Sequence, residues 1–271
     1  MPDSRIRQKT ACYPIRKQLD YLQWKDSTAG VIALDLELKQ KQFNAAMELY
    51  TGKPVYKSVG RTVSTVNVFL QIYLLIQIAA MPIDPAWQII AIFLAFILAD
   101  FVNGLVHLYM DNNDSYESIA GPFIANFHLH HKKPMYRRHP LLLVYFNETG
   151  SKIWLVGYLI LVSLLLGAAG FNPVVMHILV YAGILSSVAE VSHYLCHTSN
   201  SSIAMFLGRT RLLLPKRHHA KHHMSDNKNY AFLNGVTDPL INLIAGKTCP
   251  GYKNTTDRHF ARYAGEGSEN R

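Results

Sequence analysis

Four long apolar runs alternate with charged segments along the chain. They cover residues 62–81, 86–110, 153–171 and 174–197, and their only Asp, Glu, Lys or Arg residues are Asp100 and Glu190. Each run has about the 20 residues that a helix needs to cross the hydrocarbon core of a bilayer. The pattern predicts an all-α integral membrane protein with about four transmembrane helices.

The runs form two pairs, and the turns that join them, 81–85 and 170–173, hold no Lys or Arg. Every Lys and Arg lies before the first run, between the second and third, or after the fourth. Because cytoplasmic segments of membrane proteins are enriched in Lys and Arg, we expect both termini and the central loop to be cytoplasmic. The corresponding membrane is the endoplasmic reticulum in a eukaryote and the inner membrane in a bacterium.

This arrangement divides the chain into three expected parts: a basic cytosolic lead (1–61), a membrane domain (62–246) and a polar C-terminal tail (247–271). The net charge is +9, but no helix-turn-helix, zinc-finger or RNA-binding signature accompanies it. We therefore assign the excess to contact with anionic lipid headgroups and expect no nucleic acid. The three cysteines form no CxxC pair, which argues against a disulfide framework.

Histidines gather on the side of the membrane that is predicted to be cytoplasmic. His107 ends the second run with Asp111 four residues later, and His193 and His197 end the fourth. Two segments, 127–139 and 213–223, add His128, His130, His131, His139, His218, His219, His222 and His223. Imidazole is the commonest protein ligand for transition metals. Four separate segments thus predict a metal site beneath a His-rich helical cap.

The number of imidazoles indicates more than one ion. One zinc ion takes three or four ligands, whereas eight or more histidines suit two ions with five or six ligands each. Nitrogen-rich sites with open positions favour iron and oxygen chemistry. A site at the membrane boundary is well placed to act on a lipid chain, so the residues alone predict a membrane enzyme that activates O₂ at two metals.

The positions of two acids and of two further histidines also predict their roles. Asp100 lies two helical turns before His107, and Glu190 lies one turn before His193. We expect each carboxylate to accept an imidazole N–H and so to orient a ligand; a hydrogen bond between helices is the alternative. His177, at the opposite end of the fourth run, and His259, in the tail, are expected to take no part.

Four motifs, in this order, resemble the Kua/CarF family of lipid desaturases. They read Ala99-Asp100-Phe101-x-x-Gly104-x-Val106-His107-x-x-x-Asp111, Phe127-x-x-His130-His131, His193-x-x-x-His197 and Pro215-Lys216-Arg217-His218-His219-x-x-His222-His223. The resemblance covers residues 98–240. One branch of that family contains the plasmanylethanolamine desaturases, and a related branch introduces a trans double bond into acyl chains of phosphatidylglycerol.

The resemblance implies a set of site residues. The implied metal ligands are His107, His130, His131, His193, His197, His219, His222 and His223, with His218, His139 and Asp111 as further candidates. Asn147 joins Asp100 and Glu190 as a residue that supports the ligands. Lys132, Lys133, Arg137 and Arg138 border the site and are expected to dock a phosphate headgroup or an acidic electron donor.

The resemblance also implies the reaction. Two iron ions and O₂ would introduce a C=C into a phospholipid chain. The chain has no dinucleotide-binding fingerprint and no haem-binding segment, so a partner such as a cytochrome b5 or a ferredoxin is expected to supply electrons. Other classes with a metal site remain alternatives: a di-iron lipid hydroxylase, a zinc-dependent membrane hydrolase and a non-enzymatic metal carrier.

The substrate expectation follows the branch. His139 and His218 are similar to the plasmanyl branch, which makes a plasmanyl ether lipid the first expected substrate and a vinyl-ether plasmalogen its product. Asn112, Asn113 and Tyr230 are similar to the other branch, which makes an acyl chain of phosphatidylglycerol the alternative.

The topology can be tested with reporter fusions at the two expected turns. Fusions at Asp84 and Asn172 should give the signal of the outer side, because neither turn holds a Lys or Arg. A fusion at the C-terminus serves as the cytoplasmic control. A cytoplasmic signal at either turn would contradict the paired arrangement and the placement of the histidines on one side.

Overall fold

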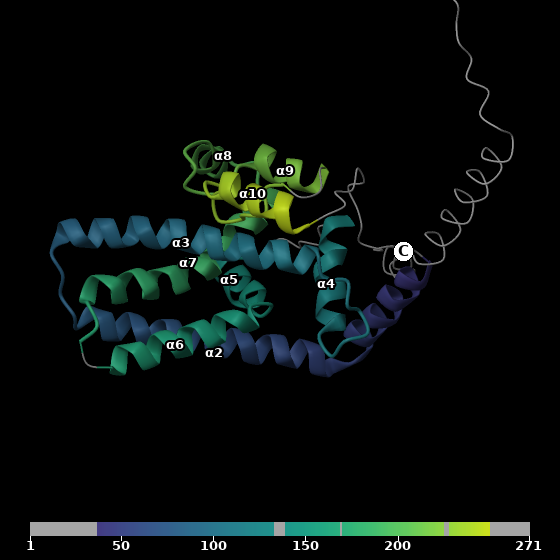
Figure 1. Cartoon of the computed structure of the whole chain (residues 1–271), viewed down its shortest axis with the longest axis horizontal. Coiled ribbons are helices and arrows are strands. Elements are labelled where there is room, and N and C mark those ends of the chain that lie inside the picture. Colours follow the sequence, from purple (N-terminus) through teal and green to yellow (C-terminus); the bar gives the residue numbers. More distant parts are fainter. Residues whose placement is uncertain (1–36, 133–138, 169, 225–227, 250–271) are drawn as a thin grey trace, which may run out of the picture.

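A computed structural model describes residues 37–132, 139–168, 170–224 and 228–249 (Figure 1). Residues 37–52 are helical, and the described residues contain no strand. The other helices are α2 (Pro54–Ala79), α3 (Pro85–Asp111), α4 (Gly121–Lys132), α5 (Leu141–Thr149), α6 (Ile153–Gly167), α7 (Pro173–Thr198), α8 (Ser202–Arg209), α9 (Lys216–Met224) and α10 (Asp238–Thr248). The chain is thus an all-α membrane protein, as its sequence predicts.

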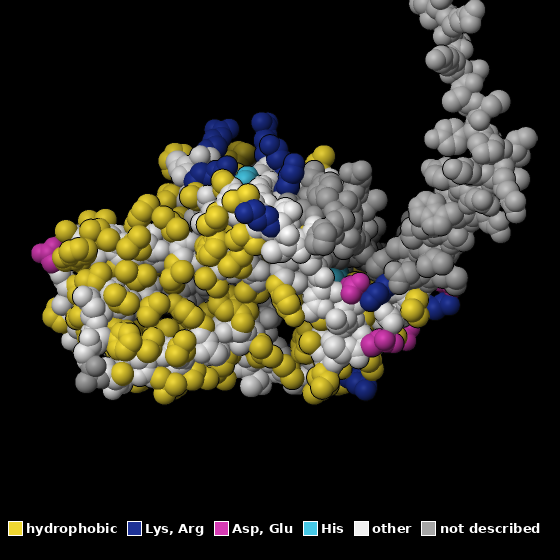
Figure 2. Space-filling view, in the orientation of Figure 1, with side chains coloured by type: hydrophobic (Ala, Val, Ile, Leu, Met, Phe, Trp, Pro, Cys, Tyr) yellow, Lys and Arg dark blue, Asp and Glu magenta, His cyan; other side chains and the backbone are white. Residues whose placement is uncertain are grey.

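Three helices, α2, α3 and α7, are long and apolar enough to cross a membrane. They have 26, 27 and 26 residues, and α3 and α7 match the predicted second and fourth runs to within a residue at each end. The surface over these helices is covered with hydrophobic side chains (Figure 2). Such a surface is costly in water and stable against lipid.

The helix α6 begins at Ile153, where the third predicted span begins, but it ends at Gly167, four residues before that span ends. Only 15 residues, Ile153–Gly167, form α6, which is too short to cross a bilayer by itself. The helix before it, α5, meets α6 at 88° across a short break, and together the two are apolar enough to form a broken span or a re-entrant loop. Residue 169, inside the predicted run, lies outside the described residues.

Proline and a polar residue fix where α3 and α7 begin. Pro85 and Pro173 occupy the first turns, where the missing N–H is not needed. The side chains of Asp84 and Asn172 accept hydrogen bonds from the backbone N–H of Ala86 and Val174, both at 2.8 Å. Both helices start at the same side of the bundle, which we call the turn end, and His107, His193 and His197 lie towards the other side, the histidine end (Figure 1).

Buried polar side chains join the helices of the bundle. Asn103 of α3 donates to Ser186 Oγ of α7 at 3.0 Å, and Gln71 of α2 donates to Ser187 Oγ at 2.8 Å. Alanines line the contact between α3 and α7 and allow close approach: Ala95, Ala99, Ala182 and Ala189. In a medium without water these hydrogen bonds define which faces meet.

A cap made of α8, α9, α10 and the segment 229–237 lies beside α3 and α7, towards the histidine end (Figure 1). Gly104 permits the approach of the cap to α3. A Cβ at this position would lie 2.3 Å from Ile241 Cδ1 and 3.2 Å from the Ala231 backbone. The absence of a side chain at Gly104 thus brings α10 against the part of α3 that carries His107.

Candidate metal centre

Seven of the eight predicted imidazole ligands meet at the histidine end in two adjacent groups. The first group draws on α4, α7 and α9 and consists of His130, His193, His197, His219 and His223. The second draws on α3 and α9 and consists of His107, Asp111 and His222. Within each group the possible ligand atoms all lie within 4.8 Å of one another.

The five imidazoles of the first group point their Nε2 atoms at a common centre. The Nε2 atom of His193 lies 3.0 Å from that of His130, 2.9 Å from that of His219 and 3.3 Å from that of His197. The Nε2 atom of His219 lies 2.9 Å from those of His197 and His223. Each of these two nitrogens therefore has three close nitrogen neighbours.

Hydrogen bonding cannot satisfy this arrangement. A neutral imidazole nitrogen offers either one N–H or one lone pair, so it cannot bond to three neighbours at once. A shared cation can, because every lone pair then points at the ion. Two nitrogens bound at about 2.1 Å and at a right angle would lie about 3.0 Å apart, which is close to the spacing observed. The donor set fits a metal ion.

Burial favours the neutral, metal-binding form of these imidazoles. His219 on α9 is fully enclosed, and this burial holds the pKa of its imidazole well below the usual range. The neighbouring imidazoles of His193 and His223 lower that pKa further. A neutral imidazole keeps the lone pair that a metal requires.

Two backbone carbonyls set the tautomers in the second group. His107 Nδ1 donates to the Tyr230 carbonyl at 2.7 Å, and His222 Nδ1 donates to the Lys228 carbonyl at 2.8 Å. In the neutral rings each Nε2 then carries a lone pair. These Nε2 atoms lie 3.5 and 3.4 Å from the same Asp111 oxygen. The two nitrogen lone pairs and the Asp111 carboxylate repel one another. A cation between them would be bound by both nitrogens and by the carboxylate.

The two groups are neighbours because α9 contributes to both. His219 and His223 belong to the first group and His222 to the second, and the rings of His219 and His222 stack with centroids 5.5 Å apart. On the other side, the His107 and His193 rings are 6.5 Å apart. The structure therefore offers two metal-binding positions in one centre.

Asp100 does not contact an imidazole, which corrects the expectation that it orients a ligand directly. Its Oδ1 accepts from the backbone N–H groups of Asn234 and Gly235, at 2.9 and 3.1 Å. Its Oδ2 accepts from the Thr237 N–H at 3.0 Å and the Thr237 hydroxyl at 2.7 Å. Asp100 instead anchors the segment 229–237, whose Tyr230 carbonyl orients His107.

Glu190 also has a different partner from the one expected. Its carboxylate pairs with Lys152 Nζ at 3.0 Å, at the break between α5 and α6. Lys152 Nζ donates to Asn103 Oδ1 as well and lies over the Phe232 ring, 4.6 Å from its centroid. That ring also packs against the rings of His107 and His193, so Phe232 lies between Lys152 and the two histidine groups.

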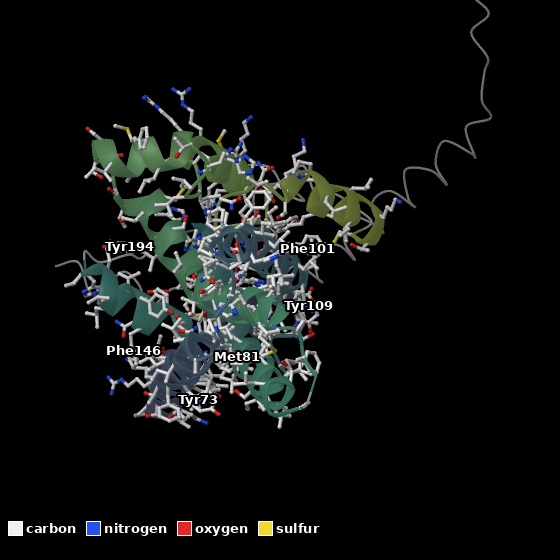
Figure 3. The ribbon with its side chains drawn as sticks, turned by 90° about the vertical axis from the view of Figure 1, so that its left-hand side faces the viewer. Tyr73, Met81, Phe101, Tyr109, Phe146 and Tyr194 are labelled. Carbon is white, nitrogen blue, oxygen red and sulfur yellow. The ribbon has the colours of Figure 1, made fainter. Side chains whose placement is uncertain are left out.

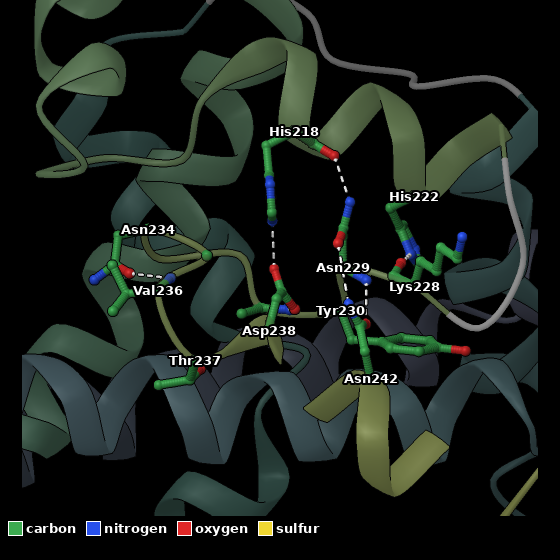
Figure 4. A network of polar contacts seen from close by, with 12 residues as sticks. His218, His222, Lys228, Asn229, Tyr230, Asn234, Val236, Thr237, Asp238 and Asn242 are labelled. Atoms are coloured by element: carbon green, nitrogen blue, oxygen red, sulfur yellow. Dashed lines mark hydrogen bonds and ion pairs between the residues drawn. The ribbon is translucent and has the colours of Figure 1, made fainter. Parts of the chain in front are cut away.

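His218 lies on α9 one turn before His222, and its ring reaches Asp238 rather than a ligand group (Figure 4). Its Nε2 is 2.5 Å from Asp238 Oδ2, while Asp238 Oδ1 accepts from the Ala231 N–H at 2.8 Å. Its backbone carbonyl accepts from Asn229 Nδ2 at 3.2 Å. His218 therefore ties α9 to α10 and is not in either metal group.

The remaining predicted site residues lie outside the two groups or outside the described structure. His139 is exposed, and its backbone N–H donates to the Tyr194 hydroxyl at 3.0 Å; Asn147 lies on the exposed face of α5. The side chains of His131 and Lys132 and the residues Lys133, Arg137 and Arg138 are not among those described. His259 also lies outside the described residues.

Two histidines have structural roles. His177, at the turn end, donates from Nδ1 to the Pro173 carbonyl at 2.8 Å. His128 is fully buried between the Tyr116 hydroxyl and the Met110 carbonyl, at 2.7 and 2.8 Å from its two ring nitrogens. Neither belongs to a metal group.

The two carbonyls could not be identified from residue types, because any residue can supply a carbonyl. The only available hint was position: Lys228 and Tyr230 closely follow the last histidine motif. Phe232 was missed for a similar reason. It reads as an ordinary core residue, although its ring lies 5.4 Å from that of His107 and 5.5 Å from that of His193.

These features define an all-α membrane protein with a histidine-rich metal-binding centre. The model of the lipid desaturase domain family matches residues 96–245, more than half of the chain. The chain belongs to this family and is accordingly assigned to the lipid desaturases, which are oxidoreductases. The comparisons with curated proteins and with solved structures gave no match.

The role of Asp100 can be tested by Asp100→Asn. The amide would turn an N–H₂ group towards buried N–H donors, and each donor left without an acceptor costs about 1–3 kcal/mol. We expect a lower thermal unfolding temperature in detergent. We also expect metal affinity to fall by about 10–100-fold, the usual effect of losing a group that supports a ligand.

Asp84→Asn is the matched control. Asp84 is exposed at the turn end and caps α3 through one hydrogen bond, and Asn is an equally good cap. Its unfolding temperature and metal affinity should stay unchanged. If both variants behaved alike, the anchoring of the segment 229–237 by Asp100 would have no bearing on the centre.

Proposed function

We propose that this chain is a membrane di-iron lipid desaturase that converts a plasmanyl ether lipid into a vinyl-ether plasmalogen. In the overall reaction, R–CH₂–CH₂–O–R′ with O₂, two electrons and two protons gives R–CH=CH–O–R′ and two water molecules. The iron pair would supply the oxidant that removes two hydrogens from adjacent carbons. The observation that carries the proposal is the pair of adjacent ligand groups in a chain of the lipid desaturase family.

The composition of the groups supports iron. Five imidazoles in one group exceed the four ligands of a typical zinc site. Nitrogen donors with one carboxylate suit iron that reacts with O₂. The chain itself supplies the ligand geometry: α9 aligns three imidazoles, the Tyr230 and Lys228 carbonyls fix two tautomers, and Phe232 covers one side with an apolar ring.

The depth of the ligands in the bilayer supports a new C=C close to the glycerol end of the lipid chain. His107 lies 22 residues after Pro85, the start of α3, and His193 lies 20 residues after Pro173, the start of α7. At 1.5 Å per residue these distances are about 33 and 30 Å, close to the ~30 Å thickness of the hydrocarbon core. With Pro85 and Pro173 at one edge of the hydrocarbon core, the ligands would lie at the opposite boundary of hydrocarbon and headgroups.

That boundary is where the first carbons of a phospholipid chain reside. The vinyl ether of a plasmalogen joins the two carbons next to the ether oxygen, so an anchored headgroup would place them at the depth of the ligands. An acyl chain of phosphatidylglycerol desaturated near its ester would fit the same depth and is the second candidate. The narrower resemblance to the Kua/CarF family favours these two substrates over others.

The same proposal includes the surroundings of the enzyme. The distribution of Lys and Arg supports cytoplasmic termini and a cytoplasmic histidine end. Electrons would come from a partner such as a cytochrome b5 or a ferredoxin. The basic segment from Lys132 to Arg138 is the proposed docking region for that partner or for the lipid phosphate.

The metal assignment can be tested with two histidines of the same helix. His193→Ala removes a ligand at the centre of the first group, so iron bound to the purified protein should fall clearly below about two ions per chain. Lipid desaturation should be lost. Iron is measured by mass spectrometry of the metal, and activity by mass spectrometry of lipids.

His177→Ala is the matched control, because His177 is equally buried on α7 but lies at the turn end. It should keep its iron and its activity. A wild-type protein that holds one zinc ion and no iron would contradict the di-iron proposal, whatever the behaviour of the two variants.

The substrate can be tested in cells that lack both candidate activities. When these cells express the chain and receive an alkyl ether phospholipid, acid-labile vinyl ethers should accumulate. The His193→Ala variant should give none. A new trans-unsaturated phosphatidylglycerol without vinyl ethers would instead favour the second substrate, and a lipid heavier by one oxygen would identify a hydroxylase.

A further inference from the structure

The segment 229–237 and α10 contact α3 well before its histidine end. A cap that lies wholly outside the membrane would contact α3 only near that end. Thr237, immediately before α10, donates two hydrogen bonds to Asp100, and Asp100 lies 15 residues after Pro85. At 1.5 Å per residue this places Thr237 about 22 Å from the start of α3. Trp87, which is exposed two residues into α3, is suited to the interface at the turn end.

A hydrocarbon core of ~30 Å that begins at Pro85 therefore ends beyond Thr237. Thr237 would lie about 8 Å inside the core, and any tilt of α3 would place it deeper. Ile241 contacts α3 at Gly104, four residues further towards the histidine end. The helix α10 thus runs in the direction of α3, from within the leaflet towards its surface.

The exposed side chains of this segment have the chemistry that such a position requires. Val236, Leu240 and Leu243 are exposed by 49%, 52% and 56%. Leu240, Leu243 and Lys247 are spaced i, i+3 and i+7, so they share the face of α10 that points away from α3. The one acid of α10, Asp238, is buried and bonded to His218.

The figures show the same arrangement. Figure 1 shows α10 alongside α3 rather than beyond its end, and in the view along the span helices α10 lies at the side of the bundle near Phe101 (Figure 3). Lys and Arg side chains gather over the outer part of the cap, whereas hydrophobic side chains cover the surface of the span helices below it (Figure 2). The cap therefore has a basic outer part and an apolar part next to the bundle.

We propose that residues 229–248 form a re-entrant segment that enters the leaflet at the histidine end, with Val236, Leu240 and Leu243 against lipid acyl chains. The side chains of Asp100, Asp238 and Asn242 accept hydrogen bonds from the backbone N–H groups of Asn234, Ala231 and Asn229, which lowers the cost of taking this backbone into hydrocarbon. Lys247, at the end of α10, reaches the headgroups. This inference does not depend on the reaction or on the metal.

Site-directed spin labelling of the full chain in phosphatidylcholine vesicles tests the proposal. Single cysteines are introduced by Val236→Cys, Leu240→Cys and Lys247→Cys after the native cysteines have been replaced. Collisions with O₂, which concentrates in hydrocarbon, are compared with collisions with chromium oxalate, which stays in water. The ratio should be several-fold higher at Val236 than at Lys247, with Leu240 between them.

Lys221→Cys, on the exposed face of α9, is the control inside the same cap and should have the low ratio of Lys247. A ratio at Val236 and Leu240 as low as at Lys221 would place the segment in water and overturn the proposal. Low collision rates with both reagents at Val236 and Leu240 would also overturn it, because the face would then be covered by protein, such as a second copy of the chain. Leu243→Cys replaces Val236→Cys if the latter fails to fold, and its ratio should still exceed that of Lys221.

Discussion

A carboxylate buried in a membrane helix needs hydrogen-bond donors, and Asp100 finds four of them in one short segment of the cap. Leaving these groups unpaired in a medium without water would be costly, so this contact fixes the cap against α3. The same segment carries the Tyr230 carbonyl, which orients His107, and Phe232, which packs on the ligands. The geometry of the centre is therefore tied to the middle of a transmembrane helix.

A second buried network positions α7 in a comparable way. Lys152, at the break between α5 and α6, neutralises Glu190 and bonds to Asn103 of α3. The chain turns at this break, and the turn brings the Lys152 ammonium group into the bundle. A helix that continued straight from α5 into α6 would not bring it there. Charged groups within a membrane are tolerated when they are paired in this manner, and the pair holds α7 one turn before His193.

The sequence predicted what periodicity and composition determine. The lengths of α3 and α7 follow from uninterrupted apolar runs, and the ligand groups follow from histidines at helix ends and at i, i+3 and i+4 on α9. The 88° bend before α6 was not predicted, because α5 lies in the segment that was expected to be a cytoplasmic loop rather than part of a span. The partners of Asp100, Glu190 and His218 were also out of reach, since they depend on backbone groups and side chains that approach only in the folded chain.

The helix α9 has only nine residues, yet it supplies ligands to both metal groups. The apolar side chains of α9, Ala220 and Met224, are exposed, so polar contacts rather than core packing hold the helix: those of His218 to Asp238 and of His222 to the Lys228 carbonyl. An ion in the first group would fix His219 and His223 and thereby place His222 for the second. The two positions would then be coupled through one short helix, because a shift of α9 at either position would move ligands of the other.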